Sequence, residues 1–313
     1  MSQQTAEEPV TPDAAEELTA PACVMSFNVS DPTGAGGLAA DVTTIAAMGA
    51  HPLPVTTAVQ MRDTAEVFDA TALEADTIVE QARSVLEDVT IGAWKVGYLG
   101  SAEAVGAVAE VLSDYTDVPL VTYLPNLAWV DEDDESQAYQ DALRELVLPL
   151  TEVLVGNQKT LTDFLLPEWD AERPPSAREL AAAAHEHGTR YVLVTGVQLP
   201  NQFIDNVLAS PQGAITGEKF ERFEAAFVGA GDTLSAALAA LLATGQELHI
   251  AVSEALSFLD QSLDAGFRPG MGHVVPDRFF WALPSAEEGE EGPAEPGEPA
   301  DENGKPIHPR NVH

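Results

Sequence analysis

The segment Gly229-Ala230-Gly231-Asp232-Thr233 combines two glycines with an acidic residue directly before a run of small and apolar residues. Glycines allow a tight turn and bring backbone N–H groups close to a ligand. The run that follows predicts a buried helix, and a helix N-terminus favours phosphate through its unpaired N–H groups and partial positive charge. Because Asp232 would repel phosphate, we interpret it as a base that accepts the proton of an attacking hydroxyl. The alternative is an ordinary helix with Asp232 or Thr233 as its N-cap.

A second glycine-rich segment lies near the N-terminus, where residues 30–37 read Ser-Asp-Pro-Thr-Gly-Ala-Gly-Gly. A short apolar strand is expected before it at residues 24–27, and a helix of small residues after it at residues 37–48. Ligand sites of open α/β sheets gather at the C-terminal ends of the strands, where this loop would lie. The segment therefore predicts either a ligand-binding loop or a structural turn.

Strand-like apolar runs alternate with helical patterns along the rest of the chain. Strands are expected at residues 54–60, 91–96, Leu120–Tyr123, 153–155 and 191–195, and helices at Ala75–Leu86, 102–112, 137–148, Ala177–Glu186, 231–242 and Leu248–Asp264. Such alternation predicts a mostly parallel sheet with helices on both faces. Two further runs, at residues 203–209 and 220–227, are expected to form antiparallel edge strands on either side of a Ser-Pro-Gln-Gly turn.

Composition narrows the classes of partner and the domain organisation. The 313 residues carry a net charge of -37, which argues against nucleic acids and anionic membranes as partners. With no membrane-spanning apolar run, no signal-peptide pattern and one cysteine, the chain is expected to be cytoplasmic and free of internal disulfides. Residues 1–20 and 286–313 are acidic and poor in apolar side chains, so we expect two disordered tails around one domain at 21–285.

The two glycine-rich segments together resemble the bacterial hydroxymethylpyrimidine/phosphomethylpyrimidine kinases of the ribokinase superfamily. The Ser/Thr-Asp-Pro-Ser-Gly-Gly-Ala-Gly-type loop of that family and its following Ala-Asp match residues 30–37 and Ala40-Asp41. The resemblance continues in order through residues 95–99, 155–157, 229–237 and 270–273, and covers residues 22–284. It implies a three-layer ribokinase-like α/β fold, with a mostly parallel central sheet, helices on both faces and antiparallel edge strands.

The resemblance also implies an activity and a set of site residues. It points to a kinase that uses ATP and Mg²⁺ to phosphorylate the hydroxymethyl group of 4-amino-5-hydroxymethyl-2-methylpyrimidine in thiamine biosynthesis, with the monophosphate of that compound left open as a second substrate. It also suggests a homodimer, and it leaves the metal ligands undetermined. The expected residues are Asp232 with the N–H groups of Gly229, Ala230 and Gly231 for catalysis, Asp31, Gly36, Arg62 and Tyr98 for the substrate, and Asn157, Thr195 and Thr233 for ATP.

Several positions depart from the family pattern. Asp232 stands where these pyrimidine kinases usually have Cys, as in the sugar-kinase branch of the superfamily, and Tyr98 stands where they usually have Met. Thr160 and Thr195 occupy the places of a metal-linked Glu and of a Lys that touches the ATP phosphates. Loss of such a phosphate contact could raise the barrier by a few kcal/mol, which slows a kinase roughly a hundredfold.

Arg62 occupies the place of a Gln that reads the pyrimidine in the family, and Gln60 takes that place if the register shifts by two residues. An arginine there either binds a phosphorylated or anionic substrate, or points to solvent or to a neighbouring acid such as Asp63 or Glu66. Two other functions therefore remain open. Arg62 and Tyr98 favour a kinase of another small alcohol, such as a pyridoxal-type vitamin, whereas the lost Lys and Glu favour a non-catalytic ligand-binding relative.

Overall fold

The computed structural model describes residues 20–282, in which residues up to Arg278 belong to one compact unit and residues 279–282 to a second. Apart from Ala20, the two expected tails lie outside the described residues. Within residues 20–282, no helix is long and apolar enough to cross a membrane.

The first unit is built on one nine-stranded sheet with the order β3-β2-β1-β4-β5-β6-β7-β8-β9. Six neighbouring strands, β2, β1, β4, β5, β6 and β7, run parallel to one another. Strand β3 pairs antiparallel with β2 at one edge, and β8 and β9 complete the other edge as antiparallel strands. Their bounds are β1 Cys23–Ser30, β2 His51–Arg62, β3 Val67–Ala72, β4 Ala93–Val96, β5 Leu120–Tyr123, β6 Val153–Asn157, β7 Tyr191–Gln198, β8 Phe203–Ser210 and β9 Gly213–Glu221.

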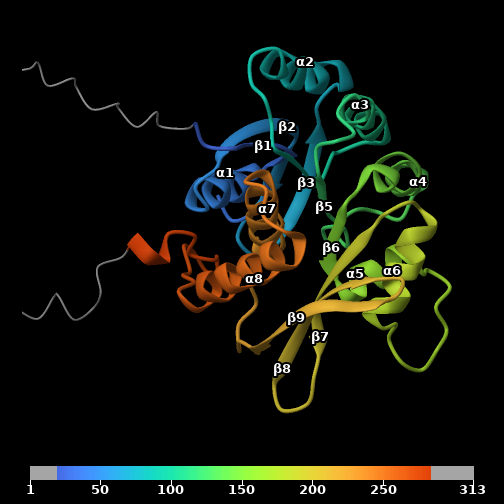
Figure 1. Cartoon of the computed structure of the whole chain (residues 1–313), viewed down its shortest axis with the longest axis vertical. Helices are drawn as coiled ribbons and strands as arrows, with labels where there is room; N and C mark the ends of the chain where they lie inside the picture. The colour runs from blue at the N-terminus through green and yellow to red at the C-terminus, as the bar shows by residue number, and fades with distance from the viewer. Residues whose placement is uncertain (1–19, 283–313) are drawn as a thin grey trace, which may run out of the picture. The chain divides into compact units, whose positions relative to one another are not determined.

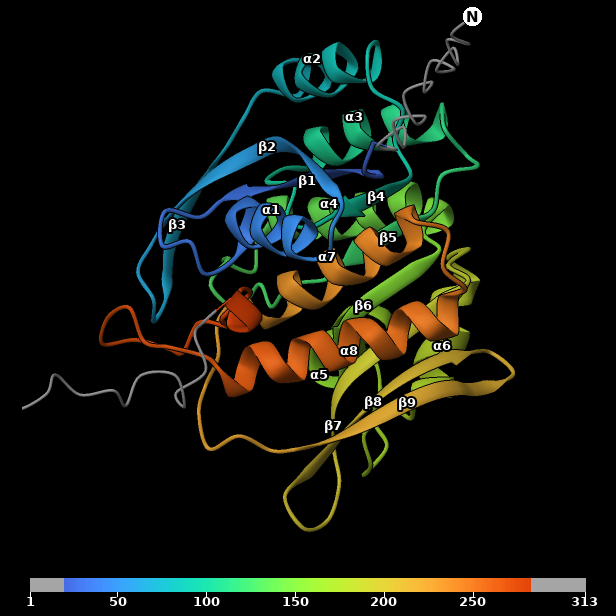
Figure 2. The same ribbon diagram turned by 60° about the vertical axis from the view of Figure 1, so that its left-hand side comes forward.

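Helices cover both faces of this sheet (Figure 1, Figure 2). One face carries α1 (Gly37–Ala47), α7 (Ala230–Ala243) and α8 (Leu248–Asp264). The other carries α2 (Ala75–Leu86), α3 (Ala102–Ser113), α4 (Asp134–Ala142), α5 (Gln158–Leu165) and α6 (Ala177–Glu186), with a π-helical turn η1 (Leu143–Val147) and a 3-10 turn η2 (Leu148–Leu150) after α4. The expected three-layer α/β architecture is confirmed.

The helix α7 is the most deeply buried helix of the site region. Its residues from Thr233 to Leu241 are all buried, because α7 packs on β4 and β5 and is flanked by α1 and α8. Four of these nine residues are alanines, whose small side chains allow the helix to pack closely against its neighbours. This packing fixes the position of the N-terminus of α7, where Asp232 lies.

Two expectations about elements were wrong in their bounds, and one strand was missed. Only residues 220 and 221 of the run expected at 220–227 belong to a strand, since β9 begins at Gly213, immediately after a two-residue turn, and ends at Glu221. The edge strand β3 was missed, and its mostly exposed side chains explain the weak apolar signal. The helix expected at 137–148 begins earlier, at Asp134, where Asp133 caps it, and changes to π-helical geometry at Leu143.

Candidate active site at the N-terminus of α7

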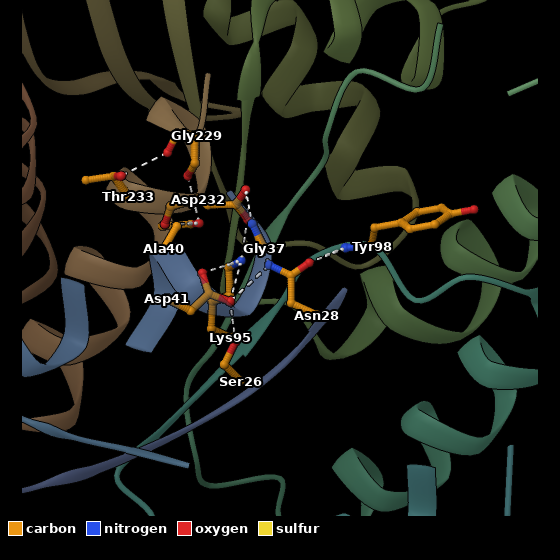
Figure 3. Close-up of polar contacts among 12 residues, drawn as sticks. Ser26, Asn28, Gly37, Ala40, Asp41, Lys95, Tyr98, Gly229, Asp232 and Thr233 are labelled. Atoms are coloured by element: carbon orange, nitrogen blue, oxygen red, sulfur yellow. Dashed lines mark hydrogen bonds and ion pairs between the residues drawn. The ribbon is translucent and has the colours of Figure 1, made fainter. Parts of the chain in front are cut away.

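Four elements bring polar side chains together beneath the N-terminus of α7 (Figure 3). Strand β1 supplies Ser26 and Asn28, helix α1 supplies Asp41, strand β4 supplies Lys95, and the first turn of α7 supplies Asp232. We refer to these five residues as the carboxylate–lysine cluster.

Lys95 is the centre of the cluster. Its ammonium Nζ lies 2.8 Å from Asp41 Oδ1, 3.0 Å from Asp41 Oδ2 and 2.8 Å from Asp232 Oδ1. The side chains of Lys95 and Asp41 are completely buried, whereas 14% of the Asp232 side chain is exposed. Lys95 therefore compensates two buried carboxylates at once, of which only Asp232 can be reached from solvent.

One amide group and one hydroxyl group of β1 donate further hydrogen bonds to the two carboxylates. Asn28 Nδ2 donates to Asp41 Oδ2 (3.0 Å) and to Asp232 Oδ1 (2.9 Å), and Ser26 Oγ donates to Asp41 Oδ2 (2.5 Å). The other end of the Asn28 amide accepts hydrogen bonds from the backbone N–H groups of Val29 and Tyr98. Because all its hydrogen-bonding groups are engaged, Asn28 holds the two carboxylates in a fixed relative position.

The surroundings in the cluster raise the pKa of one carboxyl group and lower the pKa of the other. Burial raises the pKa of Asp41, and Lys95 offsets this only in part. Burial would also raise the pKa of Asp232, but Lys95, the N–H of Gly37 and the Asn28 amide outweigh it, so the net shift is downward. Burial would lower the pKa of Lys95, but the two carboxylates raise it above its usual value. Asp232 is therefore ionised at neutral pH.

Asp232 keeps one free position for an incoming donor. A carboxylate accepts about four hydrogen bonds, and Asp232 Oδ1 already accepts from Lys95 and Asn28 while Oδ2 accepts from the N–H of Gly37 at 3.0 Å. A Cβ on Gly36 would lie 3.1 Å from Oδ2, so the glycine leaves space beside this oxygen. The chain itself therefore provides three of the hydrogen bonds that the Asp232 carboxylate accepts.

The backbone before α7 has the form expected for an anion-binding turn. Gly229 is the N-cap of α7 with φ of 83°, a left-handed conformation that favours glycine, and it provides no side chain to cap the helix. A Cβ at this position would overlap the carbonyl oxygen of Ala35 in the glycine-rich loop. The N–H groups of Ala230 and Gly231 lie in the first helical turn, where the helix has no carbonyl to receive them. These groups fit a transferring phosphate.

Arg278 donates hydrogen bonds to both glycine-rich segments. Its Nε donates to Thr233 Oγ1 (2.9 Å), and its Nη1 and Nη2 donate to the carbonyl oxygens of Gly34 (3.4 Å) and Ala35 (2.6 Å). The residue is only 6% exposed. Thr233 was expected to contact ATP. Its hydroxyl accepts the hydrogen bond from Arg278 Nε and donates to the carbonyl of Gly229.

The expected substrate residues fall into two groups. Asp31 is buried and shapes its own loop, because it accepts from the N–H groups of Thr33 and Gly36. Arg62 pairs with Asp31, at 3.4 Å between Nη1 and Oδ2, and its Nε donates to the backbone carbonyl of Asp63 (3.1 Å), one of the two acids named for it from the sequence. Asp31, Gly36 and Arg62 therefore lie together beside the carboxylate–lysine cluster.

Tyr98 belongs to the second group. Its backbone joins the cluster through Asn28, but its ring points away from Asp232 (Figure 3) and packs against Trp129 and Tyr139. These three rings line a cavity of about 1210 Å³ that also reaches Asn157 and Thr160. Tyr98 thus lies between the cluster and this cavity.

Two of the three expected ATP residues lie on adjacent strands, whereas Thr233 lies in α7. Asn157 and Thr195 are register partners in β6 and β7. The Asn157 side chain caps α5 through the N–H of Thr160 and donates to Thr160 Oγ1 (2.8 Å), while Thr195 Oγ1 donates to the carbonyl of Gly156. Among residues 20–282, no group of three or more His, Cys, Asp or Glu side chains is placed to hold a metal ion.

Sequence reasoning missed four members of this site. Ser26, Asn28, Lys95 and Arg278 were not expected to have a role, and Asp41 was noted only as part of a motif. One signal was available, because Lys95 interrupts an apolar run that was expected to be a buried strand. A lysine in such a strand requires a buried counter-charge.

The chain matches known proteins over most of its length. The family model described as phosphomethylpyrimidine kinase matches residues 31–277. The chain belongs to the phosphomethylpyrimidine kinase family. The hydroxymethylpyrimidine/phosphomethylpyrimidine kinase of Streptomyces coelicolor is 30% identical over 264 residues, which are 84% of this chain and 96% of that protein.

Two further similarities place the family match in context. The thiamine biosynthetic bifunctional enzyme of Arabidopsis thaliana is 30% identical over 77% of this chain, which corresponds to 46% of that protein. An ADP complex of Bacillus subtilis pyridoxal kinase has a TM-score of 0.76 at 21% identity, over 85% of this chain and all of that chain. The structural likeness supports the ribokinase-like fold.

Proposed function

We propose that this chain is an ATP-dependent kinase that phosphorylates the hydroxymethyl group of 4-amino-5-hydroxymethyl-2-methylpyrimidine in thiamine biosynthesis. One observation carries the proposal. Asp232 lies in the first turn of α7 with 14% of its side chain exposed, and Lys95 holds the pKa of its carboxyl below the usual value. Membership of the phosphomethylpyrimidine kinase family and the names of the relatives support the substrate.

The roles of the residues follow from their positions. Asp232 orients the acceptor hydroxyl and receives its proton as the hydroxyl oxygen attacks. The N–H groups of Gly229, Ala230 and Gly231 stabilise the charge on the transferring phosphoryl group. Lys95 keeps Asp232 ionised and in place but is itself buried, so it acts through Asp232 and not on the substrate.

The nucleotide and metal are part of the proposal. Asn157, Thr195 and Thr233 are proposed to surround ATP. Each of their side chains also bonds to a backbone group of this chain. Mg²⁺ would neutralise the phosphate oxygens, and such ions are held largely through phosphates and water. We assign no residue of this chain as its ligand. A homodimer and a cytoplasmic location are further proposals, of which the first is testable by light scattering.

The proposed function is tested by ADP release from Mg-ATP with hydroxymethylpyrimidine, with pyridoxal, and without an acceptor. We expect turnover that depends on the pyrimidine and exceeds the rate with pyridoxal. Equal or greater turnover with pyridoxal would assign the chain to another alcohol, and binding of the pyrimidine without any turnover would indicate a ligand-binding relative.

A further inference from the structure

Tyr123 is the last residue of β5 and packs against the first turn of α7. A Cβ on Gly231 would overlap Cε2, Cζ and the hydroxyl oxygen of this tyrosine, so the hydroxyl end of the ring lies against bare backbone. The same ring lies near Lys95, whose Nζ is 5.7 Å from the ring centroid. Tyr123 therefore brings a hydroxyl group to the turn whose N–H groups fit a transferring phosphate.

The hydroxyl of Tyr123 is available to a ligand. Within residues 20–282 it forms no hydrogen bond, and it is not among the unpaired polar atoms that the protein encloses, so a bound group can reach it. Tyr98, by contrast, donates from its hydroxyl to the carbonyl of Gly100. A tyrosine whose ring packs inside a protein usually finds a partner for its O–H group. The hydroxyl of Tyr123 therefore points to a partner from outside the chain.

The surroundings of this hydroxyl keep it protonated. Burial raises the pKa of Tyr123, and the negative charges of Asp232 and Asp41 raise it further. At neutral pH the hydroxyl is therefore a neutral hydrogen-bond donor, and the oxygens of a phosphate group can accept from it without repulsion.

The cations near this turn are held within the chain. Lys95 is completely buried and contacts two carboxylates. Arg278 is 6% exposed and donates to three acceptors of the chain, and its charge acts on the carboxylates of the carboxylate–lysine cluster. Thr195 stands where the family resemblance places a Lys that touches the ATP phosphates. The Tyr123 hydroxyl thus supplies a donor at this turn that the chain does not already use.

We propose that Tyr123 is a further catalytic residue, whose hydroxyl donates a hydrogen bond to the transferring phosphoryl group beside the N–H groups of Ala230 and Gly231. The proposal rests on the proposed function, because it requires phosphoryl transfer at this turn. In that step the acceptor oxygen forms a bond to the γ-phosphorus, the bond to the bridging oxygen of ADP breaks, and the acceptor proton passes to Asp232. Tyr123 keeps its own proton and stabilises the charge on the phosphoryl oxygens.

The kinetic test uses Tyr123→Phe, which removes the hydroxyl and keeps the ring that packs on Gly231. Tyr115→Phe is the matched control, because Tyr115 precedes β5, whereas Tyr123 ends it, and packs its ring against Trp94. With Mg-ATP and hydroxymethylpyrimidine, the kcat of Tyr123→Phe should fall by about 10²-fold while KM for the pyrimidine is unchanged, since the lost bond acts on the phosphoryl group. The control should keep the wild-type kcat, and both variants should keep the wild-type circular dichroism spectrum.

Calorimetry with ADP, Mg²⁺ and aluminium fluoride, which takes the place of the transferring phosphoryl group, tests the contact without turnover. Tyr123→Phe should bind this combination about tenfold or more weakly than the wild type and should bind ADP alone equally well. If the wild type binds the combination but does not phosphorylate the pyrimidine, the proposed function is wrong, while the binding comparison still decides the role of Tyr123. An unchanged kcat in Tyr123→Phe, equal binding of the combination by both proteins, or an equal loss of affinity for ADP alone would overturn the role of Tyr123.

Discussion

Replacement of Lys95 by methionine is the perturbation that tests the carboxylate–lysine cluster most severely. Methionine has a similar length and is apolar, so the change removes the ammonium while largely filling the space. The ammonium makes three contacts of 2.8 to 3.0 Å with two carboxylates and is completely buried. Removing one partner of a buried ion pair typically destabilises a protein by about 3–5 kcal/mol, because a buried charge is left uncompensated.

The same substitution should change the dependence on pH. In the wild type, the lowered pKa of Asp232 contributes stability that is present above its unfolded pKa and is lost as the pH falls through the folded value. In Lys95→Met, the hydrogen bonds from Gly37 and Asn28 still lower the pKa of Asp232, but the ammonium no longer counters burial and the charge of Asp41, so this pKa rises. The acid limb of kcat/KM should therefore move to higher pH, and the stability deficit should be largest at neutral pH and shrink as the solution is acidified.

Urea unfolding at neutral and acidic pH measures these effects. Lys159→Met is the matched control, because Lys159 pairs with Asp163 on the surface with 85% of its side chain exposed, and its loss should cost at most about 1 kcal/mol. A second change, Asp41→Asn, made in the Lys95→Met background should recover about 1–3 kcal/mol by removing one unpaired charge. A loss below about 1 kcal/mol for Lys95→Met, or an acid limb that does not move, would show that the ammonium does not hold the two carboxylates in their ionised state.

Three further predictions concern the surrounding segments. Gly229→Ala should lower the free energy of unfolding by more than the ~1–2 kcal/mol of left-handed strain, since its Cβ would also overlap the backbone of Ala35. Gly245→Ala is the control, because Gly245 has a φ of 82° and open space around a Cβ, so this variant should show the strain alone. Equal losses for the two variants in urea unfolding would contradict this prediction. Arg278→Lys should destabilise the protein by about 1.5–3 kcal/mol, because charged hydrogen bonds are lost. The control Arg83→Lys, on the surface, should cost less than about 0.5 kcal/mol. Equal thermal midpoints for the two variants would contradict this prediction. Thr195→Lys should raise kcat/KM for ATP up to about a hundredfold by restoring a phosphate contact, and steady-state kinetics without any gain would show that the contact is not made.

Local sequence patterns predicted the regular elements well where burial is periodic. The bounds expected for three helices, Ala75–Leu86, Ala177–Glu186 and Leu248–Asp264, agree with the structure. Each of these helices has one apolar stripe and a polar face, so the pattern of its residues alone defines it. The strand Leu120–Tyr123 was likewise expected with its observed bounds, because it is an apolar run between turn residues.

The site was harder to predict, because its contacts are long-range. The sequence indicated Asp232 through its position before a helix of small residues, and it indicated the glycine-rich loop. It did not indicate the contact between Lys95 and Asp41, which are 54 positions apart, or that between Asn28 and Asp232, which are 204 apart. Such pairs depend on the order of strands in the sheet and on the helix that crosses it, which local periodicity does not determine. The pairing of Arg62 with Asp31 was missed for the same reason.

Asp232 is proposed to serve phosphoryl transfer to the hydroxymethyl group of the pyrimidine. The most direct test of this role is mass spectrometry of the products formed by purified protein from Mg-ATP and hydroxymethylpyrimidine, for the wild type and for Asp232→Asn, with circular dichroism to show that the variant is folded. We predict that the wild type adds one phosphoryl group to the hydroxymethyl oxygen and that the folded variant forms less product by a factor of about 10² or more. Product formation by Asp232→Asn at the wild-type rate would contradict the account.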